Sequence, residues 1–212
     1  MTTIRGTTKK CAVCGHEQSF TEIMSTNRFG YMDLDTRPPE MERSTIRYAV
    51  QLCEECAYSS RDISKMIDGI TSEDVEAEDY RAIADDTKTD KLAKAFLLAG
   101  HLYAAAEHRR SAGISYLNAA WVFDDLKEKD NAKQARARAI ENIAAYTEGS
   151  EDIGLRTMLV DMHRRNGEFE EAERIARQLI AQGAEDLIAE VLELQIKLCA
   201  GKDDRCHTVE EV

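Results

Sequence analysis

Four cysteines in two pairs are the residues of this sequence best suited to chemistry. Cys11 and Cys14 form one CxxC motif, and Cys53 and Cys56 form a second. A two-residue spacer lets both sulfurs of a pair face one metal ion, at about 2.3 Å when the metal is zinc. Four thiolates together favour a soft divalent cation. The pattern therefore predicts one zinc ion held by all four cysteines.

The predicted zinc site is structural, because four protein ligands leave no coordination position for water or a substrate. A module of about 60 residues also needs extra stabilisation, since its hydrophobic core is small. The 38 residues between Cys14 and Cys53 exceed the spacing of roughly 15–20 residues in common zinc ribbons. The alternative is two unrelated pairs of reduced, buried or redox-active thiols. His16 could replace a cysteine ligand, but we interpret it as an exposed turn residue.

The residues beside the two motifs predict their local structure. Gly15 follows the first motif and can adopt the positive φ angle that such a turn often needs. Ala57 stands at the equivalent place in the second motif, so it is either strained or part of a turn of another shape. Apolar residues alternate with other residues between Ile46 and Leu52, which predicts a half-buried strand leading into Cys53.

The stretch between the motifs contains paired carboxylates beside an arginine, in the run Asp33-Leu34-Asp35-Thr36-Arg37. Such a group could form a site. However, no histidine or nucleophile stands nearby in the sequence to complete a mechanism. We interpret the run as a turn-rich loop in which the three charged side chains form caps and an ion pair.

Composition divides the chain near residue 60. Residues 1–60 contain both prolines and four of the six cysteines, whereas the remainder has no proline. Nothing in that remainder therefore forbids continuous helix. Of the formal net charge of -12, residues 1–60 carry -1 and the remainder carries -11. We predict a zinc-ribbon-like module with four cysteine ligands over residues 1–60 and a helical domain over residues 61–212.

The second region matches the tetratricopeptide pattern, in which small residues lie where two helices of a repeat of about 34 residues cross. The stronger match consists of Phe96, Ala99, Gly100, Tyr103, Ala112, Tyr116 and Ala119. A weaker match consists of Leu159, Gly167, Phe169, Ala172 and Ala176. Breaks and caps predict helices over residues 72–86, 90–108, 111–128, 131–147, 151–165, 168–182 and 185–199. The helix 131–147 matches neither repeat, so the array is degenerate or this helix packs as an extra one.

Solenoids of this kind bind partners along a concave face, which the first helix of each pair lines. Two sets of residues would point to that face. The predicted partner-binding residues are Lys94, Leu97 and His101 in the first match, and Asp161, Arg164 and Arg165 in the second.

Together these motifs resemble a bacterial family of unassigned function, the domain-of-unknown-function 2225 family. The resemblance rests on the CxxCG motif from Cys11, the Asp-Leu-Asp-Thr-Arg-Pro-Pro loop from Asp33 and the CxxC-Ala-Tyr motif from Cys53. It covers residues 11–60 closely and the helical part loosely. It implies a cysteine zinc module joined to tetratricopeptide-like helices, and it implies no known activity. The second motif departs from the family's usual CPxCG-Tyr, because it lacks both the proline and the glycine.

Charge and hydropathy narrow the class of protein. A pI near 5.0 gives no long-range attraction to nucleic acid or anionic lipid. The longest apolar stretch, about Ala95 to Ala106, is far shorter than the roughly 18 residues that span a membrane. Residues 1–10 are polar and lack the apolar core of a signal peptide. We expect a cytoplasmic protein, in which thiols stay reduced.

The sequence predicts a mostly α-helical, non-catalytic zinc-binding adaptor whose helical array binds a protein or peptide. It contains no Walker loop and no GxGxxG, HExxH or GxSxG motif, so we do not expect an enzyme.

One alternative is a nucleic-acid-binding regulator that gathers basic residues of the module on one face: Arg5, Lys9, Lys10, Arg28, Arg37, Arg43 and Arg47. Another is an enzyme or thiol redox sensor that uses the Asp33–Arg37 loop or the cysteines. A second metal at Cys199, Cys206 and His207 is not expected, because they lie across a glycine in a polar tail.

Overall fold

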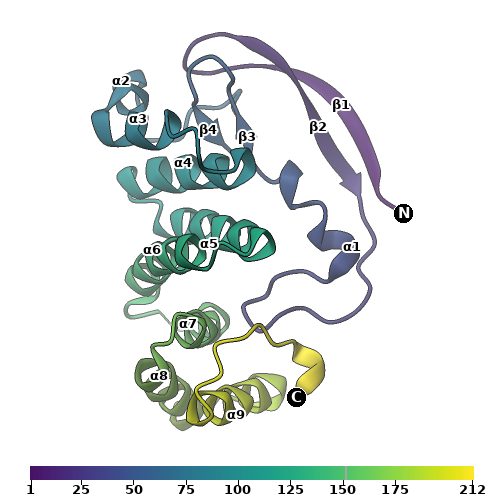
Figure 1. Cartoon of the computed structure of the whole chain (residues 1–212), viewed down its shortest axis with the longest axis vertical. Coiled ribbons are helices and arrows are strands. Elements are labelled where there is room, and N and C mark those ends of the chain that lie inside the picture. The colour runs from purple at the N-terminus through teal and green to yellow at the C-terminus, as the bar shows by residue number, and fades with distance from the viewer. Residues whose placement is uncertain (151) are drawn as a thin grey trace.

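A computed structural model describes residues 1–150 and 152–212. The described part of the chain is mostly helical, with a small β-containing module at the N-terminus and a helical array after it (Figure 1). The array consists of α2 (Ser72–Glu76), α3 (Glu78–Ala84), α4 (Lys91–Ala105), α5 (Arg109–Leu126), α6 (Lys129–Thr147), α7 (Ile153–Arg165), α8 (Phe169–Ala181) and α9 (Asp186–Ala200). The predicted fold class is confirmed.

The helices of the array follow the sequence prediction closely. The helix predicted over 72–86 is divided into α2 and α3 at Ala77, whose ψ of 144° is extended. The other six begin and end within a few residues of their predicted positions. Residue 151, the predicted start of one helix, lies outside the described residues, and α7 begins at Ile153.

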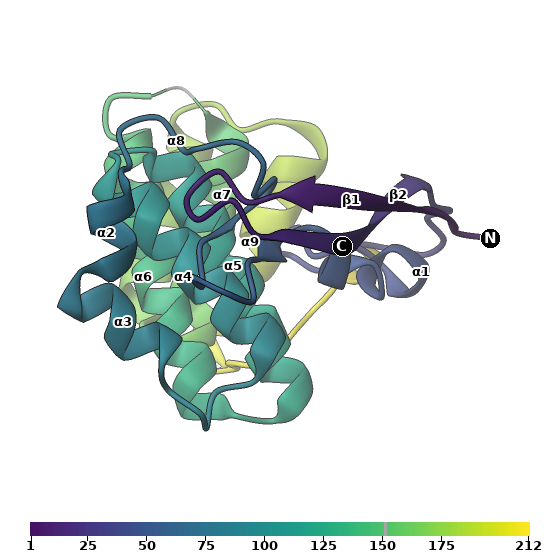
Figure 2. The ribbon, with the colours of Figure 1, turned by 90° about the horizontal axis from the view of Figure 1, so that it is seen from above.

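Two antiparallel hairpins form the module. The long one pairs β1 (Thr3–Lys10) with β2 (Glu17–Ser25) and projects away from the array (Figure 2). The short one pairs β3 (Gln51–Leu52) with β4 (Ser59–Ser60). Each hairpin carries one CxxC motif in its turn. The two motifs therefore occupy equivalent places in two hairpins of very different length.

The strand predicted over residues 46–52 was mostly wrong, because only its last two residues belong to β3. Ile46–Tyr48 instead form a 3-10 helix. The Tyr48 N–H donates to the Thr45 carbonyl at 2.9 Å, and the Ala49 N–H donates to the Ile46 carbonyl at 3.0 Å. These local bonds satisfy backbone groups that would otherwise need a neighbouring strand. Ile46 and Tyr48 are half-buried and Arg47 and Ala49 are exposed, so the alternation of burial exists although the backbone is not a strand.

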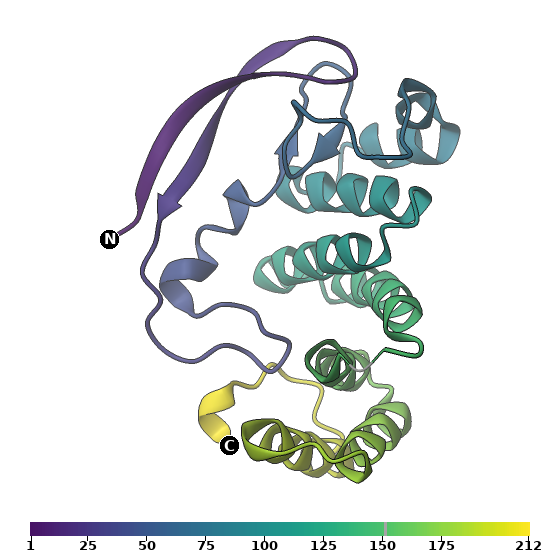
Figure 3. The same ribbon diagram turned by 180° about the vertical axis from the view of Figure 1, so that it is seen from behind.

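The segment over residues 26–50, which we call the insert, returns from the long hairpin along the ends of the array helices (Figures 1 and 3). It contains the short helix α1 (Glu40–Arg43). Near its start it meets the C-terminal tail, residues 201–212. The Leu34 N–H donates to the His207 carbonyl at 3.0 Å, and the Val209 N–H donates to the Met32 carbonyl at 2.9 Å. The insert therefore joins the two terminal regions of the chain.

The module and the first array helices share one hydrophobic core. Cys53 and Tyr58 are buried in the same cluster as Tyr80 of α3 and Leu98 of α4. The Ser59 hydroxyl of β4 also donates to the Ala95 carbonyl of α4 at 2.7 Å. The boundary at residue 60 remains a prediction, and the apolar packing runs across it.

Close helix contacts at two glycines build the array. A Cβ atom placed on Gly100 would lie 2.9 Å from the ring of Tyr116 in α5, which is closer than real Cβ contacts. This confirms the predicted packing of Gly100 against the second helix of the stronger match. A Cβ on Gly113 of α5 would lie 2.5 Å from Ile143 of α6. The helix α6, which matched neither repeat, therefore packs on α5 as tightly as α5 packs on α4.

Candidate metal centre

The four cysteines of the two hairpin turns meet at one point. All four sulfur atoms lie within 4.8 Å of one another. The Sγ atoms of Cys11 and Cys56 are 3.7 Å apart, and those of Cys14 and Cys53 are 3.6 Å apart. A tetrahedron with four metal–sulfur bonds of about 2.3 Å has edges of about 3.8 Å. The four cysteines are not joined by disulfides, and their spacing fits one tetrahedral ion.

The two motifs have the same backbone hydrogen bonds. In the first, the Cys11 N–H donates to the His16 carbonyl at 2.8 Å, and the Gly15 N–H donates to the Cys11 carbonyl at 3.0 Å. In the second, Cys53 donates to the Tyr58 carbonyl at 2.9 Å, and Ala57 donates to the Cys53 carbonyl at 3.0 Å. The second turn therefore has the shape of the first, although it lacks the glycine.

Ala57 holds a backbone conformation that favours glycine. Its φ is 61°, close to the 76° of Gly15. A residue with a Cβ atom in this left-handed region costs about 1–2 kcal/mol. Of the two possibilities left open by the sequence, the structure therefore has the strained alanine in an unchanged turn. The hydroxyl of Tyr80 in α3 donates to the Ala57 carbonyl at 2.7 Å and fixes this turn.

The rest of the module and the first array helices position the cluster. The Gln18 amide of β2 donates to the Leu52 carbonyl at 3.0 Å and accepts from the Glu54 N–H at 2.9 Å. One side chain of the long hairpin therefore hydrogen-bonds to the backbone on both sides of Cys53. The Ala12 N–H of the first motif donates to the Ile63 carbonyl at 2.8 Å. Both turns are thus held by groups outside their own hairpins.

Burial changes the pKa values of two of the four thiols. It raises the pKa of Cys53 and of Cys56. Only a thiolate binds a metal, so the ion must displace protons from these two residues and its affinity depends on pH. His16 is half-buried rather than exposed, and it does not belong to the cluster of possible ligands. The donor set is therefore four sulfurs.

A family model described as an uncharacterized protein conserved in bacteria, DUF2225, matches residues 6–197. The chain belongs to this family. The match includes all four cysteines of the cluster and ends within α9, before the tail. No curated protein and no solved structure matches the chain. In the part of the chain that the structure describes, no helix is long and apolar enough to cross a membrane.

The charged side chains of the Asp33–Arg37 loop are buried and form ion pairs with α1 and the array instead of within the loop. Asp35 is 0% exposed. Its Oδ2 accepts from Trp121 Nε1 of α5 at 2.7 Å and from Arg165 Nη1 of α7 at 2.9 Å. Arg37 donates to Asp125 of α5 at 2.5 Å. The predicted turn exists, since the Thr36 N–H donates to the Asp33 carbonyl at 2.8 Å. The predicted local ion pair does not, because each charged side chain has a partner outside the loop.

Further ion pairs extend this arrangement, which we call the buried ion-pair network. Arg165 Nη2 also donates to Asp124 Oδ2 at 2.6 Å, and Arg136 Nη2 of α6 donates to the same oxygen at 2.7 Å. Arg43 of α1 donates to Asp33 Oδ1 at 2.6 Å. The network comprises Asp33, Asp35, Arg37, Arg43, Trp121, Asp124, Asp125, Arg136 and Arg165.

The predicted partner-binding residues of the weaker match lie inside the protein. Asp161, Arg164 and Arg165 are all buried. Arg164 donates to Asp161 at 2.6 Å and to Gln195 of α9 at 2.6 Å, and it also donates to tail carbonyls. Asp161 and Arg164 are therefore out of reach of a partner, whereas Arg165 borders a pocket. An Asp and an Arg three residues apart on a helix can form an ion pair. The spacing of Asp161 and Arg164 was therefore the one sequence signal for this buried pair.

The predicted residues of the stronger match are half-buried on α4. Lys94 donates to the Ala84 carbonyl at 3.2 Å. The His101 Nε2 lies 3.4 Å from the carboxylate of Asp79. Leu97 packs against the hydrophobic clusters between the helices. Their role in partner binding remains a prediction.

Most basic residues of the module that could gather for nucleic acid have acidic partners. Lys9 lies 2.7 Å from Glu22 and 2.9 Å from Asp62. Arg28 lies 2.7 Å from Glu42. Arg37 and Arg43 belong to the buried ion-pair network. Pairing of this kind lowers the positive potential that attracts phosphate backbones.

The cysteines and histidine near the C-terminus lie apart from the cluster. Cys199 is buried in the core between α7, α8 and α9. The His207 Nδ1 lies 2.7 Å from the Glu211 carboxylate. Across the described residues, the group of His, Cys, Asp or Glu side chains placed to hold a metal is the four-cysteine cluster.

Proposed function

We propose that the chain is a non-catalytic adaptor, in which one structural zinc ion holds the cysteine module and the helical array binds a protein or peptide. The proposal rests on the near-tetrahedral arrangement of four cysteine sulfurs, which come from two equivalent turns. Four sulfur ligands suit zinc, and they leave it no open position for chemistry. The ion then serves to fix the module on the array.

The closed ligand set supports a structural role more than a redox role. The core around the cysteines includes side chains from α3 and α4, such as Tyr80 and Leu98. Loss of the ion would leave four thiols packed together, two of them with pKa values raised by burial. A buried group of this kind gains from a cation that neutralises the thiolates.

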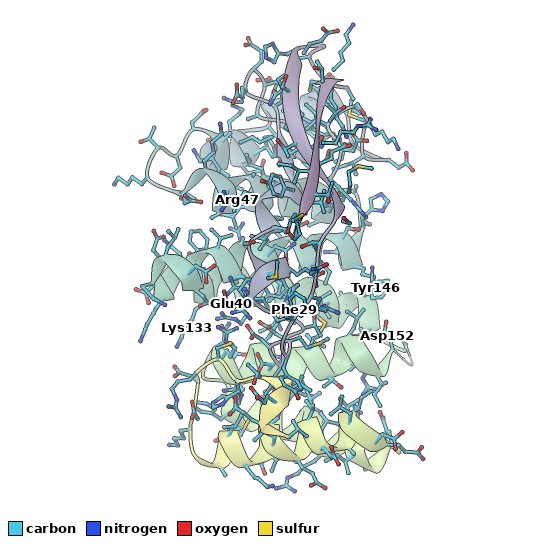
Figure 4. The ribbon with its side chains drawn as sticks, turned by 90° about the vertical axis from the view of Figure 1, so that its right-hand side faces the viewer. Phe29, Glu40, Arg47, Lys133, Tyr146 and Asp152 are labelled. Carbon is cyan, nitrogen blue, oxygen red and sulfur yellow. The ribbon has the colours of Figure 1, made fainter. Side chains whose placement is uncertain are left out.

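A groove on the array supports binding of a peptide. It has a volume of about 1080 Å³ and lies between the C-terminal end of α6, α7 and α8. Apolar residues such as Ile153 and charged residues such as Arg156 and Arg174 line it together. A mixed lining of this type suits an extended peptide, because apolar contacts give affinity and polar groups give orientation. Tyr146 of α6 and Asp152, the N-cap residue of α7, lie at the same edge of the array (Figure 4).

Two measurements test the two halves of the proposal. Elemental analysis of purified protein should find close to one equivalent of zinc, and protein that is folded without metal would contradict the structural ion. For the array, affinity purification from native cells should recover a partner with the wild type but not with the double variant Arg156→Ala and Arg174→Ala. The matched control is Arg177→Ala, an exposed arginine of α8 outside the groove. Equal recovery with all three proteins would refute the groove as the binding surface.

A further inference from the structure

A basic pocket lies where the insert, the array and the tail meet. It has a volume of about 440 Å³. Eight of its twelve lining residues are Lys or Arg, three are Asp, and the last is Cys206. They come from the insert, from α5, α6 and α7, and from residues 204–206 of the tail. We call this cavity the basic pocket.

The basic pocket has an excess of positive charge in an acidic protein. The lining alone has five more cations than carboxylates. Four further carboxylates, Asp33, Asp35, Glu40 and Asp203, pair with lining arginines from outside the cavity. Counting them still leaves one more cation than carboxylates, whereas the whole chain carries -12. A concave site with an excess of one sign of charge concentrates ions of the opposite sign.

Two buried arginines of the basic pocket have donors without acceptors. Arg136 is 2% exposed and Arg37 is 5% exposed. The Nε–H of each finds no hydrogen-bond partner among the described residues. The pKa of Arg136 is lowered by burial and then by the positive charge of Arg165. Each guanidinium already pairs with an aspartate through Nη2, but buried donors in native proteins are usually all paired, so each arginine can still take a further acceptor.

The N-terminal part of α6 adds to this arrangement. Lys129, Lys133 and Arg136 stand at positions i, i+4 and i+7, which places them on one face of the helix. The N-cap residue Glu128 makes no side-chain hydrogen bond to the first amides of α6. Unpaired amides and the helix dipole both favour an anion there. Lys133 also lies 3.9 Å from Asp204 of the tail, on the opposite side of the array from Tyr146 (Figure 4).

We propose that the basic pocket binds a small phosphate-bearing molecule, with Arg37 and Arg136 holding phosphate oxygens and the rim lysines neutralising the charge. A planar guanidinium donates two parallel hydrogen bonds to a phosphate group. The lining offers charged groups and one thiol, and no aromatic ring on which a nucleobase could stack. The ligand is therefore a compact polyanion, such as a diphosphate or a phosphorylated small metabolite. Such a ligand would stabilise the joint between insert, array and tail.

Calorimetric titration of the full chain with pyrophosphate, and separately with inorganic phosphate, tests this proposal. The binding variant is Lys129→Gln with Lys133→Gln, which leaves the buried arginines in place. The matched control is Lys65→Gln with Lys88→Gln, which changes the net charge equally at exposed positions outside the pocket. Salt is kept at about 50 mM, because screening weakens such contacts.

We expect saturable 1:1 binding of pyrophosphate by the wild type and the control, and about tenfold weaker binding by the binding variant. Pyrophosphate should also raise the midpoint of thermal unfolding of the wild type more than that of the binding variant. Absence of saturable binding, or equal affinity in all three proteins, would overturn the proposal. A phosphoserine peptide that binds more tightly than pyrophosphate would overturn the small-molecule ligand and point to a protein partner.

Discussion

The cysteine cluster and the buried ion-pair network hold the same N-terminal segment to the array at two places, by different chemistry. The cluster joins the two hairpin turns beside α3 and α4. The network joins the insert to α5 and α7, and it also links α6 to α5. In the cluster, local spacing sets the geometry, since each pair of ligands lies within four consecutive residues. In the network, Asp35 and Arg165 are 130 residues apart. The first attachment is therefore visible in the sequence, and the second depends on the complete fold.

The two attachments also differ in what their loss would leave behind. If the cluster holds zinc as proposed, removing one thiolate leaves the ion with three protein ligands. Removing one buried carboxylate leaves a buried guanidinium without its counter-charge, and this costs more than the pair itself contributes. The following variants separate these two effects.

Replacing a ligand of the cluster should have the largest effect. We expect Cys53→Ser to lose most of the bound metal and to unfold both hairpins, because metal binding and folding of such a module are coupled. Elemental analysis measures the metal, and amide exchange in β1 and β2 measures the fold. Cys206→Ser, outside the cluster, is the control and should keep the metal. Full metal content in Cys53→Ser would show that three cysteines suffice.

Breaking the buried ion-pair network should have the next largest effect. Asp35→Asn keeps the shape of the side chain but removes one of the two negative charges that pair with Arg165. We expect a loss of about 3–5 kcal/mol in the free energy of unfolding, with the metal retained. Glu171→Gln, which removes an ion pair with Arg174 that is exposed on both sides, should cost less than about 1 kcal/mol. Equal losses in denaturant titrations of the two variants would mean that burial of Asp35 is energetically unimportant.

Overpacking the array should have an intermediate effect that leaves both attachments intact. Gly100→Leu would place its side chain against the Tyr116 ring, and we expect it to cost about 1–3 kcal/mol. A thermal melt measures the change, and metal content should stay at the wild-type value. A raised melting midpoint would refute the close helix contact, because helix propensity alone favours leucine over glycine.

Relieving the strained turn should have the smallest effect. Ala57→Gly removes a Cβ atom at a φ of 61° and should stabilise the protein by about 1 kcal/mol. The reverse change in the first turn, Gly15→Ala at a φ of 76°, should destabilise it by about 1–2 kcal/mol. Denaturant midpoints of both variants test whether the two turns are equivalent. Opposite signs are expected, and equal signs would contradict the equivalence.

The helices and the four-cysteine cluster could be predicted because their signals are local. Proline-free, alanine-rich sequence and regular breaks predicted the helices, and Gly100 predicted a close contact that the Tyr116 ring confirms. The prediction failed over Ile46–Tyr48, where local hydrogen bonds form a 3-10 helix although apolar and polar residues alternate as in a strand. It also placed Asp161 and Arg164 on a binding face, because charged residues are usually exposed.

The sequence by itself determined the chemistry of the cysteine cluster, the helical character of the array and membership of a bacterial family. These features depend on residue types at short spacings, so they can be predicted without the tertiary structure. Only the tertiary structure decided that Asp35 meets Trp121 and Arg165, and that basic side chains from the insert, the array and the tail surround one pocket. Such groups are brought together by packing across as many as 130 residues, and no local pattern encodes where a distant ion-pair partner lies.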